Sequence, residues 1–133
     1  MLSDDKCMAW KYEQLTGRFL DPEGDLKGVG YSGQLPHVND PDAQSVHDSG
    51  PIPAGKWQAV ELIPESTSHG PFVIRLEPYD STETFGRAGF MIHGDSIKIP
   101  GHASHGCIIQ SRDVRELFWA SPDHDIDVVR GGE

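Results

Sequence analysis

The residues best suited to chemistry lie in one stretch, from Phe90 to Gln110, which contains a thiol, nearby imidazoles and a carboxylate. Cys107 follows Gly106, and His93 and His105 are the candidate partners of its thiol. A cysteine reacts as its thiolate, so it needs a base or a cation beside it, and an imidazole within hydrogen-bond reach supplies both. Gly106 allows a close backbone approach to a substrate carbonyl, and nearby amides could stabilise the oxyanion formed after attack. This combination predicts acyl transfer.

Two other interpretations of the same residues remain open. Zn²⁺ takes histidine, cysteine and carboxylate ligands, and the spacing His102-x-x-His105-x-Cys107, with His93 and Asp95 upstream, is compact enough to chelate it. No H-E-x-x-H or paired C-x-x-C motif accompanies this set. Alternatively, Cys107 is a small buried side chain between apolar neighbours, which leaves the surrounding cluster of polar residues unexplained. We favour a thiol enzyme that needs no metal or other cofactor.

The spacing also resembles that of a known family. Thirteen residues separate His93 from Cys107, and the block Ser104-His105-Gly106-Cys107 resembles the signature of L,D-transpeptidase (YkuD-type) catalytic domains, in which a histidine precedes an S/T-H-G-C block. Residues 30–33, 50–55, 85–87 and 92–95 together resemble the small L,D-transpeptidase-like domain of type VI secretion effectors. This resemblance spans roughly residues 10–109.

The resemblance implies a reaction and a set of roles. Cys107 would be the nucleophile and His93 its base, and an ion pair between them would preserve the thiolate below the ordinary thiol pKa of about 8.5. The substrate would be an L,D peptide bond of a peptidoglycan stem peptide, and the acyl-enzyme would pass to water (L,D-carboxypeptidase) or to an amine (L,D-transpeptidase). The residues expected to support the site, by orienting an imidazole or shaping the loop, are His105, Asp95, Ser104 and Gly106.

Four further residues are candidates for binding the substrate. Many members of the resembled family carry a basic residue soon after the nucleophile, whereas this chain has Ile108-Ile109-Gln110. A substrate carboxylate must then be bound elsewhere, and Arg87 and Arg112 are the available guanidinium groups, although Arg87 could instead form an internal ion pair. In a glycine-rich segment, Tyr31 and Ser32 either line the substrate site or belong to a bulged strand.

Composition narrows the class of protein. A length of 133 residues suits one domain, and we expect an N-terminal tail over residues 1–9 and a single catalytic domain over 10–133. Eleven Lys and Arg against 21 Asp and Glu give a formal charge of -10, which argues against nucleic acid or an anionic membrane surface as a partner. We expect Cys7 and Cys107 to be free thiols. Residues 1–6 lack an apolar core and no long apolar run occurs, so neither a signal peptide nor a membrane span is expected.

These expectations leave a mismatch between substrate and compartment. Peptidoglycan lies outside the cytoplasm, so an enzyme made there without a signal peptide must be carried to it. The resemblance implies a toxin delivered by type VI secretion to the periplasm of a target cell. Such an effector would need a cognate immunity protein, and an acidic surface suits a partner with a basic face. A phage or prophage lytic enzyme, an enzyme of muropeptide recycling and a non-catalytic binding module are the alternatives.

Short strands must position the reactive residues, because fifteen Gly and ten Pro indicate many turns. Patterning predicts an opening hairpin, two central strands and a further strand that delivers His93 to its C-terminal end. The ranges are 9–20, 56–63, 72–77 and 85–92, and a long loop with at most one helical turn, near 43–46, covers 37–50.

After Cys107, two isoleucines predict a buried strand, and Ser111 predicts the N-cap of one short helix. Val114, Leu117 and Phe118 recur at helical spacing, so they should form its buried face. Residues 125–130 alternate and predict a closing strand. We therefore expect a mainly β fold of about seven strands: an L,D-transpeptidase-like, mainly antiparallel β-sandwich or barrel with one short helix after the nucleophile strand.

Overall fold

The structure is a computed structural model that describes residues 8–99, 101 and 103–132. The expectations made for Cys7, for the possible zinc ligand His102 and for most of the N-terminal tail, including the absence of a signal peptide, lie outside the described residues.

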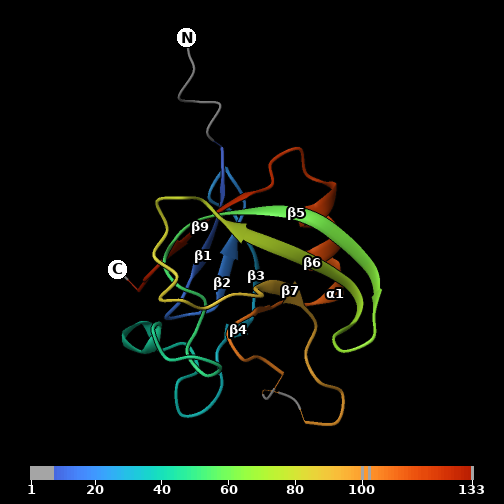
Figure 1. Cartoon of the computed structure of the whole chain (residues 1–133). Coiled ribbons are helices and arrows are strands. Elements are labelled where there is room, and N and C mark those ends of the chain that lie inside the picture. Colours follow the sequence, from blue (N-terminus) through green and yellow to red (C-terminus); the bar gives the residue numbers. More distant parts are fainter. Residues whose placement is uncertain (1–7, 100, 102, 133) are drawn as a thin grey trace.

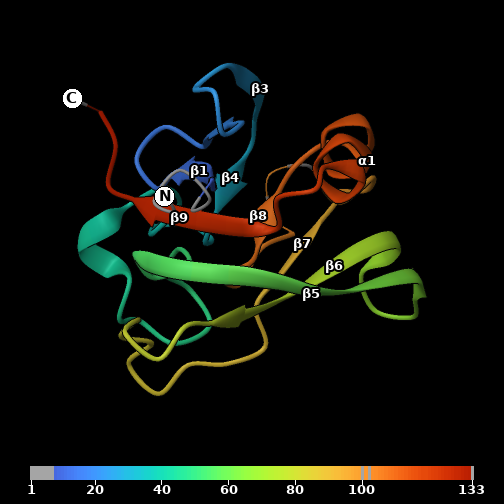
Figure 2. The ribbon, with the colours of Figure 1, turned by 90° about the horizontal axis from the view of Figure 1, so that it is seen from above.

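Nine strands of the described chain form one sheet, in the order β3-β2-β1-β9-β5-β6-β7-β8-β4. The pairs β1–β9 and β7–β8 are parallel, and the other neighbouring pairs are antiparallel. Figures 1 and 2 show the long curved hairpin of β5 and β6 facing the smaller strands across the body. The strands are β1 (Trp10–Glu13), β2 (Arg18–Leu20), β3 (Leu26–Val29), β4 (Tyr31–Ser32), β5 (Gly55–Ser66), β6 (Gly70–Pro78), β7 (Met91–His93), β8 (Ile108–Ile109) and β9 (Asp125–Val129).

Gly30 brings the two ends of this sheet together. Strands β3 and β4 stand at opposite ends of the strand order, yet only Gly30 separates them in sequence. Its N–H donates to the Gly17 carbonyl at 2.8 Å, and a Cβ on Gly30 would lie 1.6 Å from the Ile109 carbonyl oxygen. Only glycine fits so close an approach of two backbones. The sheet is therefore a nearly closed barrel, and the prediction of a mainly β barrel or sandwich with a single short helix is confirmed.

Helix α1 (Arg112–Ala120) packs on this sheet and begins as predicted, because the Ser111 hydroxyl accepts the Val114 N–H at 3.3 Å. Phe118 is fully buried in the hydrophobic core. Leu117, however, is 48% exposed, so its predicted place in the core is wrong. The buried face instead includes Arg115, whose guanidinium finds backbone acceptors there. No helix in the described chain is long and apolar enough to cross a bilayer.

The segment before His93 departs from the prediction of a strand over 85–92. Only Met91–His93 form β7, because Phe85, Gly86 and Gly89 have positive φ angles of 58°, 75° and 80°. Such angles break an extended strand and let the chain turn. His93 still ends the strand, as expected. The loop over 37–50 contains one helical turn, η2 (Pro41–Ala43), slightly earlier than predicted.

Candidate active site

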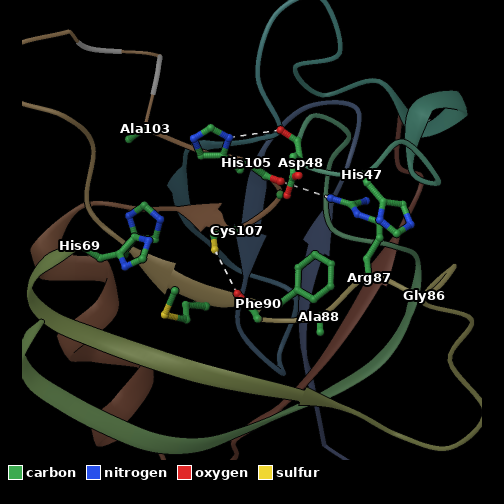
Figure 3. Close-up of a pocket in the computed structure, with 14 residues that line it drawn as sticks. His47, Asp48, His69, Gly86, Arg87, Ala88, Phe90, Ala103, His105 and Cys107 are labelled. Atoms are coloured by element: carbon green, nitrogen blue, oxygen red, sulfur yellow. Dashed lines mark hydrogen bonds between the residues drawn. The ribbon is translucent and has the colours of Figure 1, made fainter. Parts of the chain in front are cut away.

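The pairing of β7 with β8 brings His93 and Cys107 to one cavity. Ile92 pairs with Ile108, and His93 pairs with Ile109. Side chains alternate along a strand, so His93 and Cys107, which immediately precedes β8, lie on the same face of the sheet. Both line a cavity of about 240 Å³, together with His47, Asp48 and residues 86–91. Figure 3 shows Cys107 in this cavity between His69 and Phe90.

Burial keeps both groups neutral at rest. Cys107 is 8% exposed, and desolvation raises the pKa of its thiol to about 11, although the Met91 amide and the Arg87 charge oppose this shift. His93 is 2% exposed, and desolvation lowers its pKa to about 4, with smaller contributions from His69 and Arg115. The thiol is directed at the Gly89 carbonyl oxygen, 3.8 Å from the sulfur. The substrate-free site therefore favours a neutral thiol and imidazole over the ion pair expected from the sequence.

The His93 ring is oriented by a backbone carbonyl. Its Nδ1 lies 2.9 Å from the Gly94 carbonyl oxygen, which can only accept a hydrogen bond. We infer that Nδ1 carries the proton and that Nε2 bears a free lone pair, as a general base requires. The Asp95 carboxylate has other partners: it accepts from the Tyr31 hydroxyl at 2.6 Å and from the Gly101 N–H. Asp95 thus links Tyr31 to Gly101, and it acts on the imidazole only through its charge, which raises the pKa of His93 slightly.

Two buried serines hold the loop that carries Cys107. The Ser104 hydroxyl accepts from the N–H groups of Gly33 and Gly106, at 2.9 and 3.0 Å, and donates to the Cys107 carbonyl at 2.7 Å. The Ser32 hydroxyl donates to the Gly106 carbonyl at 3.0 Å and accepts from the Ile52 N–H at 2.8 Å. Both hydroxyls are fully engaged. The structure therefore gives Ser32 and Ser104 contacts that position the nucleophile loop, and the Gly106 amide is bonded to Ser104 instead of facing the cavity.

Arg87 lies beneath the same loop, and Figure 3 shows it beside the cavity. Its Nη1 donates to the carbonyls of Gln44 and Pro51, and its Nη2 donates to those of Gly50 and His105. Desolvation lowers its pKa, although the Asp48 charge opposes this shift, and Arg87 forms no ion pair within the part of the chain that the structure describes. Its positive charge instead acts on the Cys107 thiol from a fixed, carbonyl-lined position.

The remaining sequence candidates lie around the rim. The Nδ1 of His105 is 3.2 Å from the Asp48 carbonyl oxygen, and Figure 3 shows the ring directed toward Asp48. The Tyr31 hydroxyl, which donates to Asp95, also accepts from the Ala103 N–H at 3.0 Å. Arg112 is an exposed helix residue that pairs with Glu116 at 2.6 Å, and it lines a neighbouring groove instead of the cavity.

Two residues at the site were missed by the sequence reasoning. The ring of His69, at the turn between β5 and β6, has its centroid 4.7 Å from that of His93. Arg115 lies close enough to His93 for its charge to lower the pKa of the imidazole. The sequence around His69 contains no pattern that would assign this turn residue to a distant site. For Arg115, the only indication in the sequence was its place next to Val114 on the predicted apolar face of the helix.

The zinc hypothesis has little support among the described residues. No three of their His, Cys, Asp and Glu side chains are placed to hold a metal ion together. His93, Asp95 and His105 each have the separate partners given above.

The chain matches one known protein family. The Tlde1 domain family matches residues 27–127, which is most of the chain. The chain therefore belongs to this family of type VI secretion L,D-transpeptidase-like effector domains. Comparisons with curated proteins and with solved structures gave no match.

Proposed function

We propose that this protein is a cysteine-dependent enzyme that cleaves or exchanges the L,D peptide bond of peptidoglycan stem peptides. Membership of the Tlde1 family supports an L,D-transpeptidase-like effector that acts in the periplasm of a target cell. The observation that carries the chemistry is the shared cavity of Cys107 and His93, in which the Gly94 carbonyl leaves Nε2 of the imidazole free to accept a proton.

The reaction begins from the neutral pair. As Sγ of Cys107 attacks the scissile carbonyl carbon, Nε2 of His93 takes the thiol proton, and a tetrahedral oxyanion forms. The Arg87 charge and the Met91 amide, both of which favour the thiolate, stabilise the negative charge that develops at the sulfur. The C–N bond then breaks, His93 returns the proton to the leaving amine, and a thioester remains. Water or a second amine then attacks the thioester carbonyl while His93 accepts its proton, the C–S bond breaks, and His93 returns the proton to the Cys107 thiolate.

Incubation of the protein with a stem tetrapeptide tests this reaction. We expect release of the terminal D-residue, or its exchange for an added D-amino acid, and a loss of about 10³-fold or more in Cys107→Ala because the nucleophile is absent. The control is Ser81→Ala, which alters an exposed turn hydroxyl that does not line the cavity. Undiminished turnover by Cys107→Ala would exclude the nucleophile assignment.

The same assay separates the thiol enzyme from a zinc hydrolase. Prolonged treatment with iodoacetamide at alkaline pH, where part of the buried thiol ionises, should inactivate the enzyme by alkylating Cys107, and EDTA should leave turnover intact. The opposite pattern, with loss in EDTA and recovery on adding Zn²⁺, would support a metal-dependent hydrolase instead.

A further inference from the structure

A second, larger space adjoins the cavity on the other side of His93. It is a groove of about 860 Å³ between the 94–98 segment, the turn before β6 and the start of α1. His69, His93 and Ala103 line both the groove and the cavity, so the two adjoin at the imidazole. The groove is therefore close enough to receive the rest of a peptide bound at Cys107.

Two arginines beside these two spaces form no ion pair among the described residues, although the chain contains 21 Asp and Glu; the acidic charges that act on them are Asp48 on Arg87 and Glu116 on Arg115. The other four arginines all lie within 3.8 Å of a carboxylate oxygen: Arg18, Arg75, Arg112 and Arg130. Arg87 and Arg115 form no such pair within the described chain, although they are only 7% and 5% exposed. A buried charge is expensive unless it is paired or fully hydrogen-bonded. A buried guanidinium without an ion pair at each of these two positions therefore points to a role beyond folding.

The hydrogen-bond donors of the two arginines are used differently. Both terminal nitrogens of Arg87 donate to backbone carbonyls. In Arg115, Nε donates to the Ser111 carbonyl at 3.3 Å, and Nη1 donates to the carbonyls of Pro71 and Phe72 at 3.1 and 3.0 Å. Nη2 has no acceptor among the described residues. It lies 3.0 Å from the position that a Cβ on Gly94 would occupy, directly after His93.

We propose that Arg115 binds a carboxylate of the stem peptide through Nη2, in the groove beside His93. The inference rests on the proposed function and assigns its substrate carboxylate to a residue of the helix. Three backbone carbonyls fix the guanidinium, so it is held in place before the substrate arrives. Glycine at position 94 leaves the approach to Nη2 open, and Lys98, which forms no ion pair among the described residues, lines the same groove.

Three synthetic tetrapeptides test the assignment and identify the carboxylate. One has free carboxylates, one has an amide at the terminal D-residue, and one has an amide on the side chain of the diamino acid. We expect one of the two amidations to lower the kcat/KM of the wild-type enzyme by about ten- to a hundredfold, the effect of losing a charged hydrogen bond. Arg115→Gln should lose a similar factor on the free acid and should no longer distinguish the acid from that amide.

The control is Arg75→Gln, which removes the same charge from an exposed ion pair on β6 and should keep the preference for the acid. If Arg115→Gln does not fold, the wild-type comparison still decides, because equal turnover of all three peptides would overturn the proposal.

Binding measured in the Cys107→Ala background separates this inference from the proposed reaction. Acid-selective binding that depends on Arg115, in a protein without turnover, would support the carboxylate site and reject the reaction. Turnover by the wild-type enzyme, together with equal binding of the acid and the amides, would support the reaction and reject the carboxylate site.

Discussion

At the scale of single residues, burial sets the ionisation of the reactive pair. His93 and Cys107 are both desolvated, and the pKa shifts are about two units or more in opposite directions. Transfer of the proton from Cys107 to His93 therefore becomes favourable only when a substrate accepts the negative charge that develops at the sulfur. This arrangement keeps the thiol protonated, and hence less open to oxidation, while the imidazole remains a competent base at neutral pH.

The low pKa of His93 predicts a pH dependence of stability. Its pKa is about 4 in the folded protein and about 6.5 unfolded, so the unfolded chain binds more protons between these values. The free energy of unfolding should fall as the pH drops through this window, by about 2 kcal/mol from this group between pH 7 and pH 5. Denaturant unfolding at both pH values measures it.

His93→Gln should lose this part of the pH dependence, and His47→Gln, which alters an exposed imidazole bonded to the Phe85 carbonyl, should retain it. An unchanged pH dependence in His93→Gln would contradict the assignment.

At the scale of elements, two distant segments hold the nucleophile loop, and Ser104 supports it from within. Ser104, Ser32 and Arg87 each bond to its backbone. Gly106 has φ of 137°, and a Cβ there would lie 2.3 Å from Nη2 of Arg87. The glycine therefore serves two needs, because the backbone angle is unfavourable for other residues and the guanidinium occupies the side-chain space.

Gly106→Ala should consequently destabilise the protein by about 3 kcal/mol, through backbone strain and overpacking together, and should lower turnover by displacing Arg87. Gly24→Ala is the matched control, since its φ is 92° but nothing lies within 4 Å of the new Cβ. It should cost about 1 kcal/mol and leave kcat/KM unchanged. Thermal unfolding and the tetrapeptide assay measure both effects; equal destabilisation by the two variants would show that Arg87 does not constrain position 106.

At the scale of the whole molecule, positive charge is concentrated at the reactive centre of an acidic chain. The formal charge is -10, yet the two arginines that form no ion pair among the described residues, Arg87 and Arg115, line the cavity and the groove beside Cys107 and His93. Such a distribution draws an anionic peptide to the site locally while the acidic remainder of the surface suits a basic protein. We propose that an immunity protein covers this cavity in producing cells and that its basic residues contact the acidic surface around the cavity.

Expression in a Gram-negative host tests the proposed place of action. The chain should be harmless as it stands and toxic behind an added export signal, with swelling or lysis, because its substrate lies in the periplasm. Cys107→Ala should relieve the toxicity of the exported form. A harmless exported protein, combined with trimming of muropeptides by the cytoplasmic form, would favour a recycling enzyme instead.

The sequence by itself determined the fold class, the N-cap of the helix and the family, because these depend on local patterns: glycine and proline punctuation, helical spacing, and the block Ser104–Cys107. It also singled out His93 and Cys107 by type and spacing. Only the tertiary structure decided what surrounds them. Arg87 became a carbonyl-bound support because Gln44, Gly50 and Pro51, far from it in sequence, supply the acceptors.

Arg115 is buried on the helix, whereas the helical pattern had predicted burial of Leu117. His69 contacts His93 from the turn between β5 and β6. The neutral state of the His93 and Cys107 side chains likewise follows from their burial, which depends on how the whole chain packs. Burial and hydrogen-bond partners arise from long-range contacts, and a pattern read along the sequence carries no record of which distant backbone groups will meet a side chain.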